Sequence, residues 1–174
     1  MTANPETAHF RDDGVVPNSR LPVLIYHDLK LADDPGRAEA AFAANGWRGA
    51  WRDGIFPFHH FHSIAHEVLA IVGGTADMTL GGPDGERLTV HRGDVLVLPA
   101  GTGHRNSGCS EDLLVVGAYP DGMAWDVRRG DSAEHDEVRT NIAAVPLPRA
   151  DPALGPDGPL GRLWTAPEPA AAGA

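Results

Sequence analysis

The alternation of short apolar runs and turn signals between residues 51 and 119 constrains the fold more than any other feature of this sequence. Apolar runs of four to seven residues are separated there by glycine- and proline-containing turns at 73–74, 81–85, 92–94 and 99–101. Short strands joined by tight turns at this spacing are typical of an antiparallel sandwich or barrel. The chain also contains 21 Gly and 15 Pro, more than a helical protein tolerates. The sequence therefore predicts an all-β fold.

Three of these runs, at 68–72, 95–98 and 113–118, are apolar at nearly every position. A strand with one solvated face alternates apolar and polar residues, so these runs indicate strands that are buried on both faces. Their outer face must be covered by a second sheet, by the N-terminal strand or by a partner subunit. A homodimer is the expected assembly.

The length of 174 residues favours one domain with additional segments at its ends. We expect an N-terminal arm over 1–20, a barrel over 21–120, a loop-rich strap over 121–164 that packs on the barrel, and a disordered tail over 165–174, where apolar bulk is scarce. A strand is expected at 21–27. A short helix is expected near 35–45, because Asp34 can cap it, Pro35 suits its first position and Asn45-Gly46 can end it.

Charge and composition exclude several classes of function. The formal net charge is −10, and 13 of the 14 basic residues are Arg, which argues against a nucleic-acid partner because such binding requires clustered cations. No apolar run approaches the roughly 20 residues that span a bilayer, and the first residues lack the pattern of a signal peptide. Cys109 is the single cysteine, so no intrachain disulfide can form. We expect a cytoplasmic protein that binds neither nucleic acid nor membranes.

Four histidines lie close together, at positions 59, 60, 62 and 66. Side chains at i and i+2 of a strand share a face, so His60 and His62 can point into a barrel while His59 points away. Glu67 follows after a short turn and can face the same point. His104 follows the glycine-rich corner at 99–103 and supplies the fourth side chain. His66 is left as a residue that either orients Glu67 or packs elsewhere.

Three imidazoles and one carboxylate suit Mn, Fe, Co, Ni, Cu or Zn, whereas Ca and Mg prefer oxygen ligands. We expect one divalent transition metal ion, with Fe(II) favoured and Mn, Ni or Zn as alternatives. Four protein ligands leave positions open on a five- or six-coordinate ion, as catalytic sites require. A purely structural ion and a metal-free hydrogen-bonded network are the other interpretations, and the second is costly because it buries polar groups.

A substrate pocket is expected beside the metal. Phe58 is expected on the same strand face as His60 and His62, and Leu69 and Ile71 are expected on the same face as Glu67. Arg105 and Tyr119 flank the segments that carry the histidines. The same residues can instead fill the barrel or lie on its surface. Further aromatic and polar side chains near these segments carry the same two interpretations, namely Trp47, Trp51, Arg52 and Asn106.

The spacing of these residues resembles that of the cupin family. The first cupin motif resembles the series Gly54, five residues, His60-x-His62, four residues, Glu67, six residues and Gly74. The second motif resembles the series Gly93, five residues, Pro99-x-Gly101, two residues and His104. The one departure is Gly108, where the family has asparagine, while Asn106 lies two places earlier.

Most of the chain, including FRDDGVVPNSRLPVLIY and WRGAWRDGIFPFHHFHSIAHEVL, resembles the bacterial YjlB-type cupins, which have a single domain and are largely uncharacterised. The resemblance implies a cupin double-stranded β-helix, or jelly-roll barrel, with one or two short peripheral helices. It also implies that His60, His62, Glu67 and His104 hold the metal.

Three hypotheses on function follow. The first is a non-haem Fe(II) dioxygenase that acts on a small organic molecule, with Glu67 as metal ligand and as catalytic base. The second is a redox-neutral isomerase, epimerase or lyase that uses Mn, Ni or Zn as a Lewis acid. The third is a non-enzymatic protein that binds a small ligand. A transcriptional regulator is disfavoured, because the sequence shows no segment long enough for a DNA-binding output domain.

Overall fold

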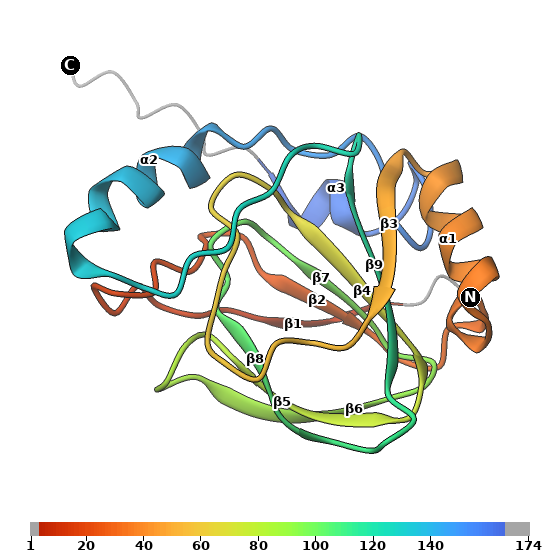
Figure 1. Ribbon diagram of the computed structural model, residues 1–174. Helices are drawn as coiled ribbons and strands as arrows, with labels where there is room; N and C mark the ends of the chain where they lie inside the picture. Colours follow the sequence, from red (N-terminus) through yellow and green to blue (C-terminus); the bar gives the residue numbers. More distant parts are fainter. Residues whose placement is uncertain (1–3, 166–174) are drawn as a thin grey trace.

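The computed structural model describes residues 4–165, and two antiparallel sheets form its centre (Figure 1). The larger sheet has the strand order β1-β2-β7-β4-β9-β3, and the smaller has the order β6-β5-β8. The predicted all-β class is confirmed. The strands are β1 (Glu6–Ala8), β2 (Val23–Tyr26), β3 (Trp47–Asp53), β4 (Glu67–Gly73), β5 (Thr75–Leu80), β6 (Glu86–His91), β7 (Val95–Leu98), β8 (His104–Cys109) and β9 (Leu114–Pro120).

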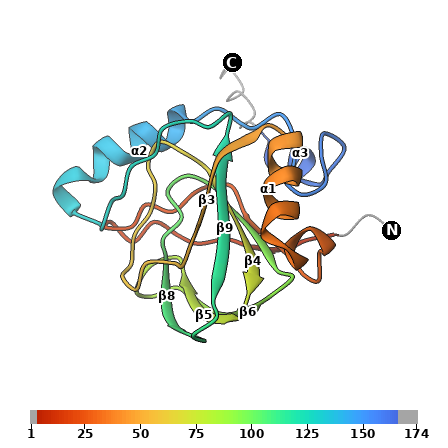
Figure 2. The ribbon, with the colours of Figure 1, turned by 45° about the vertical axis from the view of Figure 1, so that its right-hand side comes forward.

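Short helices flank the sheets, with α1 and α2 on opposite sides of the molecule (Figure 2). The helix predicted near 35–45 is confirmed, since the Asp34 side chain accepts the Arg37 N–H, Pro35 is the first residue, and the helix ends before Asn45. No helix in residues 4–165 is long and apolar enough to cross a membrane. The helical segments are η1 (Lys30–Asp33), α1 (Pro35–Ala44), η2 (Ser132–Glu134), α2 (His135–Ala144) and α3 (Leu160–Leu163).

The helix α2 lies where the sequence predicts loops. Val138 is its one buried residue, so the segment lacks the apolar stripe that identifies a helix in a sequence. It follows η2, at whose start the Asp131 side chain accepts the Ala133 N–H. Asp136 and Glu137 lie in the first turn of α2, where negative charge is favourable. The expected disordered tail lies outside the described residues, apart from Thr165.

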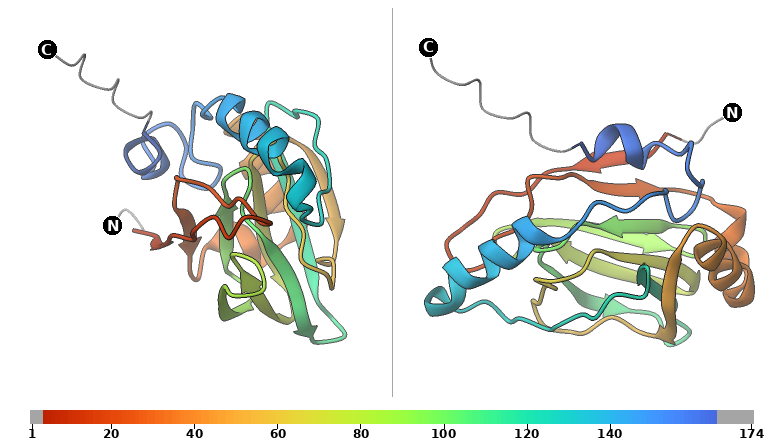
Figure 3. Two further views of the ribbon diagram at one scale, coloured as in Figure 1. Left: turned by 90° about the vertical axis from the view of Figure 1, so that its left-hand side faces the viewer. Right: turned by 90° about the horizontal axis from the view of Figure 1, so that it is seen from above.

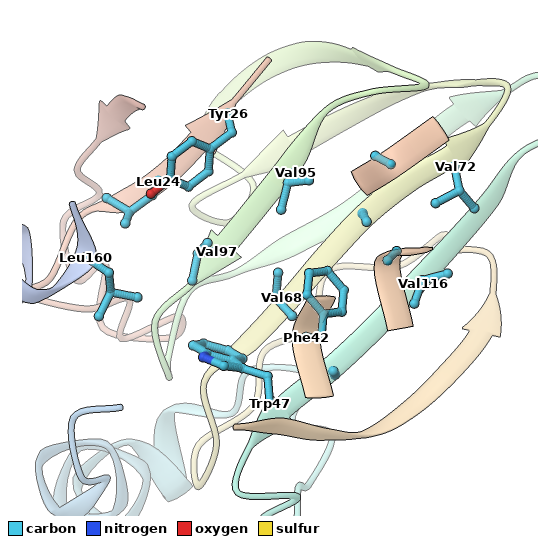
Figure 4. Close-up of a cluster of buried hydrophobic side chains, with 14 of the residues drawn as sticks. Leu24, Tyr26, Phe42, Trp47, Val68, Val72, Val95, Val97, Val116 and Leu160 are labelled. Atoms are coloured by element: carbon cyan, nitrogen blue, oxygen red, sulfur yellow. The ribbon is translucent and has the colours of Figure 1, made fainter. Parts of the chain in front are cut away.

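The strand β4 has buried side chains on both of its faces, as predicted. Val68, Ala70 and Val72 belong to one hydrophobic cluster, here called the outer cluster. Leu69 and Ile71 belong to a second, here called the inner cluster, which lies between the two sheets. The same alternation holds in β7 and β9, so the large sheet separates two cores. Figure 4 shows side chains of the outer cluster.

The outer cluster is covered by helices and by the C-terminal part of the described chain. Phe42 of α1 and Leu160 of α3 pack on the sheet, together with Trp47 and Trp164. The indole N–H of Trp164 donates to the carbonyl of Pro22 at 2.8 Å. Within the described residues, α1 and the C-terminal segment cover this face, where the sequence suggested a second sheet, the N-terminal strand or a partner subunit.

A buried hydrogen bond fixes the C-terminal segment beneath β2. The Tyr26 hydroxyl donates to the carboxylate of Asp151, which is 1% exposed. The same carboxylate accepts the N–H groups of Ala153 at 2.9 Å and Leu154 at 3.1 Å. Burial and the neighbouring Asp151 raise the pKa of Tyr26, so the phenol stays protonated and remains a donor.

We expect Trp164→Ala to lower the free energy of unfolding by about 3–5 kcal/mol, because it removes a fully buried aromatic side chain and leaves a cavity. Urea denaturation followed by circular dichroism measures the loss. Trp125→Ala is the matched control, because Trp125 is 49% exposed and its loss should change stability by less than about 1 kcal/mol. Equal stabilities of the two variants would contradict the assigned cover of the outer cluster.

Candidate metal centre and cavity

The segment 56–63 runs alongside β8 and sets the position of the histidines. The backbones of His60 and His104 exchange two hydrogen bonds of 3.1 and 2.9 Å, and the Gly101 N–H donates to the carbonyl of His62 at 2.8 Å. Phe61 and Arg128 also exchange two backbone hydrogen bonds, both of 2.9 Å, so the segment between β9 and α2 passes on the other side (Figure 3). The segment 56–63 is therefore held on both edges.

This pairing brings three imidazoles together. One ring nitrogen from each of His60, His62 and His104 lies within 4.8 Å of the other two, and these three buried residues could hold a metal ion. Their exposed fractions are 4%, 6% and 2%, and that of Glu67 is 3%. Oε2 of Glu67 lies 3.1 Å from Nε2 of His62 and 3.4 Å from Nε2 of His104. The structure thus gathers all four predicted ligands.

The backbone determines which nitrogen of each imidazole faces the centre. In His60, Nδ1 contacts the carbonyl of Phe58 at 3.0 Å. In His104, Nδ1 contacts the carbonyl of Thr102 at 3.0 Å. In His62, Nδ1 contacts the carbonyl of Asp126. A carbonyl oxygen only accepts hydrogen bonds, so Nδ1 of each ring carries a proton, and Nε2 is the nitrogen through which each ring would bind a metal ion. This arrangement of histidine is the one found in metal sites.

The electrostatics of the four side chains fit a bound cation. Burial, followed by the neighbouring His104, lowers the pKa of His60 to about 3, so its imidazole is neutral near pH 7. Burial disfavours the charged form of His62, yet the Glu67 carboxylate raises the pKa of His62. Burial likewise opposes ionisation of Glu67, but His62 and His104 lower its pKa. Three Nε2 atoms and one carboxylate directed at one point are a donor set that a divalent ion would satisfy.

Asp126 connects His62 to the segment that follows β9. Its carboxylate accepts the backbone N–H of Ser63 at 2.7 Å and the Ser63 hydroxyl at 2.6 Å. Arg128 donates to the same carboxylate at 2.9 Å, and it also binds Glu134 of η2 and Glu137 of α2, both at 3.0 Å. Although burial acts to raise the pKa of Asp126, Ser63 and Arg128 lower it. Asp126 therefore stays ionised and holds its own carbonyl against His62.

A cavity of about 460 Å³ opens onto the four side chains. Its walls are mostly apolar and aromatic, and Leu69 and Tyr119 belong to them as expected. The Tyr119 hydroxyl donates to Oε1 of Glu67 at 3.4 Å and accepts the indole N–H of Trp51 at 2.9 Å. The lining residues are Gly49, Trp51, Arg52, Asp53, Gly54, Ile55, Phe56, Pro57, His60, His62, Glu67, Leu69, His104, Tyr119 and Trp125.

Three residues expected in the pocket lie outside this cavity. Phe58 stacks on Phe56 with ring centroids 4.9 Å apart, beneath the guanidinium of Arg129. Ile71 lies farther along β4 and is fully buried in the inner cluster. Arg105 follows His104 on β8, so alternation turns it away from the cavity, and its Nε donates to the Ser107 hydroxyl at 3.1 Å. Arg105 therefore offers no cation to a substrate in this cavity.

Two further aromatic walls are Trp51, for which the sequence left substrate contact and ordinary packing open, and Trp125, which the sequence did not assign to the pocket. Trp125 belongs to the expected strap, and nothing in the sequence connects it to the cavity. Trp51 carries a signal, because it pairs with Gly117 across β3 and β9. A Cβ on Gly117 would lie 2.2 Å from the Trp51 ring. A glycine inside an otherwise apolar strand indicates such a close approach.

The remaining two histidines of the cluster do not join the centre. His66 accepts the Ala100 N–H at 2.9 Å, contacts the carbonyl of Pro146 at 3.2 Å and packs on Trp164. It therefore stabilises the corner before His104 and does not orient Glu67. Nδ1 of His59 is buried without a hydrogen-bond partner in the described part of the chain, and its pKa is lowered by burial and by Arg105.

The departure from the second motif is accommodated locally. The Asn106 side chain accepts the Gly108 N–H at 2.9 Å, and the register of β5 and β8 shifts between these two positions. An irregularity in β8 thus lies at the point where the family has its asparagine. It leaves His104, at the start of the strand, paired with Leu80.

Two facing antiparallel sheets with three histidines and a glutamate gathered between them define a cupin. The chain is 36% identical over 165 residues to the uncharacterised protein YjlB of Bacillus subtilis (strain 168), and the match covers 94% of the chain and 99% of YjlB. The chain therefore belongs to the YjlB family of cupins. No family model matches the chain.

Similarity to solved structures is weaker. A DUF861 family protein from Thermotoga maritima shares 18% identity over 55% of this chain and 96% of its own, with a TM-score of 0.36. Acireductone dioxygenase from Bacillus anthracis, with cadmium in its active centre, shares 20% identity over 57% of this chain and 63% of its own, with a TM-score of 0.37.

We expect His62→Ala and His104→Ala to abolish retention of a divalent metal, because each removes an inward-facing Nε2 from the centre. Elemental analysis of the purified variants measures the loss. His27→Ala is the control, since its imidazole pairs with Asp94 outside the cavity at 2.9 Å. Metal bound as in the unsubstituted protein after both substitutions would show that the ligands are assigned to the wrong residues.

We expect Asp126→Ala to weaken metal binding by about 10- to 100-fold, because the carbonyl that orients His62 loses its anchor to Ser63 and Arg128. Competition with a chromophoric chelator measures the dissociation constant. Asp77→Ala is the matched control, as this exposed carboxylate accepts a hydrogen bond from Thr89 on the barrel surface. An unchanged dissociation constant for Asp126→Ala would mean that the segment after β9 does not orient His62.

Proposed function

We propose that this protein is a metal-dependent enzyme that acts on a small organic molecule, and that it is a non-haem Fe(II) dioxygenase. The observation that carries the proposal is that His60, His62, Glu67 and His104 all line the cavity. An ion held by these side chains would face a space of about 460 Å³, within the usual range for small-molecule sites. A structural ion is normally enclosed by protein ligands alone.

When bound, Fe(II) would supply the ability to activate O2 and to coordinate an oxygen atom of the substrate. The protein residues would hold the reactants and exclude water. Burial and the Glu67 charge raise the pKa of Tyr119, so its hydroxyl stays protonated and donates to Oε1 of Glu67. The indole of Trp51 fixes that hydroxyl in turn. Glu67 is thereby held with Oε2 toward His62 and His104.

The cavity walls favour oxidation over chemistry that needs several proton transfers. Among the described lining residues, apart from the three imidazoles that would hold the ion, only Glu67 and Tyr119 combine burial with a group that can move a proton. Asp53 and Arg52 also line the cavity but are exposed at the strand end. Apolar walls beside an oxygen-activating ion would limit side reactions with water.

A redox-neutral isomerase, epimerase or lyase is the second candidate, and the contact between Tyr119 and Glu67 is the observation that favours it. The two side chains form a hydroxyl–carboxylate pair that could pass one proton to or from a substrate beside the metal. Such an enzyme would work with Mn, Ni or Zn, and it would need no oxygen.

The test is metal analysis of protein purified anaerobically from its own host, followed by oxygen-uptake assays with small organic acids, diols and phenols. We expect bound iron, substrate-dependent oxygen uptake, and loss of turnover when Zn replaces iron. Glu67→Gln should lower turnover by at least about 100-fold, the usual size of a general-base contribution. Turnover without oxygen in the Zn form would instead establish the second candidate, and zinc retention without any turnover would contradict both.

A further inference from the structure

The charge of the cavity restricts what it can bind. Arg52 is the one cationic side chain among the described lining residues, and its guanidinium donates from Nε and Nη2 to the carboxylate of Glu39 at 2.7 and 2.9 Å. Arg52 is thus engaged outside the cavity. A substrate with two anionic groups, such as a dicarboxylate or a phosphate ester, would find no free side-chain cation there. The walls therefore favour a molecule with at most one ionised group.

Hydrogen-bonding groups are also scarce in the walls. Apart from Glu67 and the three histidines, the Tyr119 hydroxyl is the buried polar side-chain group among the described lining residues, and it is already bonded to Trp51 and Glu67. A sugar or another polyol needs a partner for each hydroxyl group that it buries. The cavity therefore disfavours polyhydroxylated ligands.

The aromatic walls fit a flat ring. The rings of Tyr119 and Trp125 are nearly parallel, at 17° with centroids 5.8 Å apart, and Trp125 meets His62 edge-on at 5.8 Å. Trp51 lies against Gly117 at a distance that no larger residue would permit. Trp125 and Phe56 are 49% and 47% exposed, so both keep ring surface that a ligand could cover. Aromatic ligands gain from such stacked and edge-on contacts.

The floor of the cavity adds one requirement, which rests on the proposed function. Three neutral imidazoles and one carboxylate would leave a divalent ion with a net charge of +1, which attracts one anionic oxygen and repels a cationic ligand. Aromatic walls can also bind ammonium groups, but that charge opposes them here. We propose that the substrate is a planar aromatic compound with a single ionisable oxygen, a phenol, whose ring packs against the walls formed by Trp125, Tyr119 and Trp51.

The experiment measures binding of 4-methylphenol to the Zn-loaded protein, in which no oxidation occurs, by quenching of tryptophan fluorescence and by calorimetry. Oxalate, glucose and choline are the comparison ligands. We expect 4-methylphenol to bind at least about tenfold more tightly than each of them. Trp125→Ala should weaken that binding by at least about tenfold, Trp125→Phe should restore most of it because a ring remains, and both should keep their zinc. Leu147→Ala, outside the cavity, is the control.

Two outcomes would overturn the proposal: tighter binding of oxalate, glucose or choline, or equal binding of 4-methylphenol to the protein and to Trp125→Ala. Elemental analysis and binding to His104→Ala separate this proposal from the proposed function. A protein that retains no metal contradicts the metal-dependent function. In that case we still expect the aromatic walls to bind 4-methylphenol in preference to the comparison ligands, both in His104→Ala and in the unsubstituted protein. Loss of that preference would show that the proposed substrate class is wrong.

Discussion

The strict alternation of side chains along β4 is the constraint on which both the core and the candidate site depend. Val68 and Ala70 face the outer cluster, whereas Leu69 faces the space between the sheets. Glu67 begins the strand with the same orientation as Leu69 and therefore points at the histidines. A shift of one residue in the pairing with β7 would place the carboxylate in the outer cluster and valines in the cavity. The apolar packing of two cores thus fixes the position of a single charged group.

The chemistry of the site depends equally on backbone carbonyls from three separate segments. Phe58, Thr102 and Asp126 supply the oxygens that orient the imidazoles. Two of these carbonyls lie two residues before the histidine that they orient, so the local chain path provides them. The third comes from the segment after β9, which Arg128 ties to α2. The helix α2 therefore supports one of the candidate ligands.

The sequence could predict what local pattern controls. The helix α1 could be predicted from its capping residue and from the proline at its first position. The buried strands could be predicted because nearly all of their residues are apolar. Alternation placed His60 and His62 on one side, yet it failed for Phe58, because the segment forms only isolated bridges at His60 and Phe61 and is not a regular strand that early. The walls of the cavity were harder to predict from the sequence, because Trp125 reaches the site through contacts between segments that are distant in the sequence.

The cover of the outer cluster also bears on how the chain acquires its structure during synthesis. Proteins emerge from the ribosome N-terminus first, at about 5–20 residues per second. All strands of the large sheet precede Leu160 and Trp164, which complete its apolar side. The nascent barrel must therefore wait several seconds with valines of β4, β7 and β9 incompletely shielded. In that interval the uncovered apolar side of the sheet is the surface through which unfinished copies could associate.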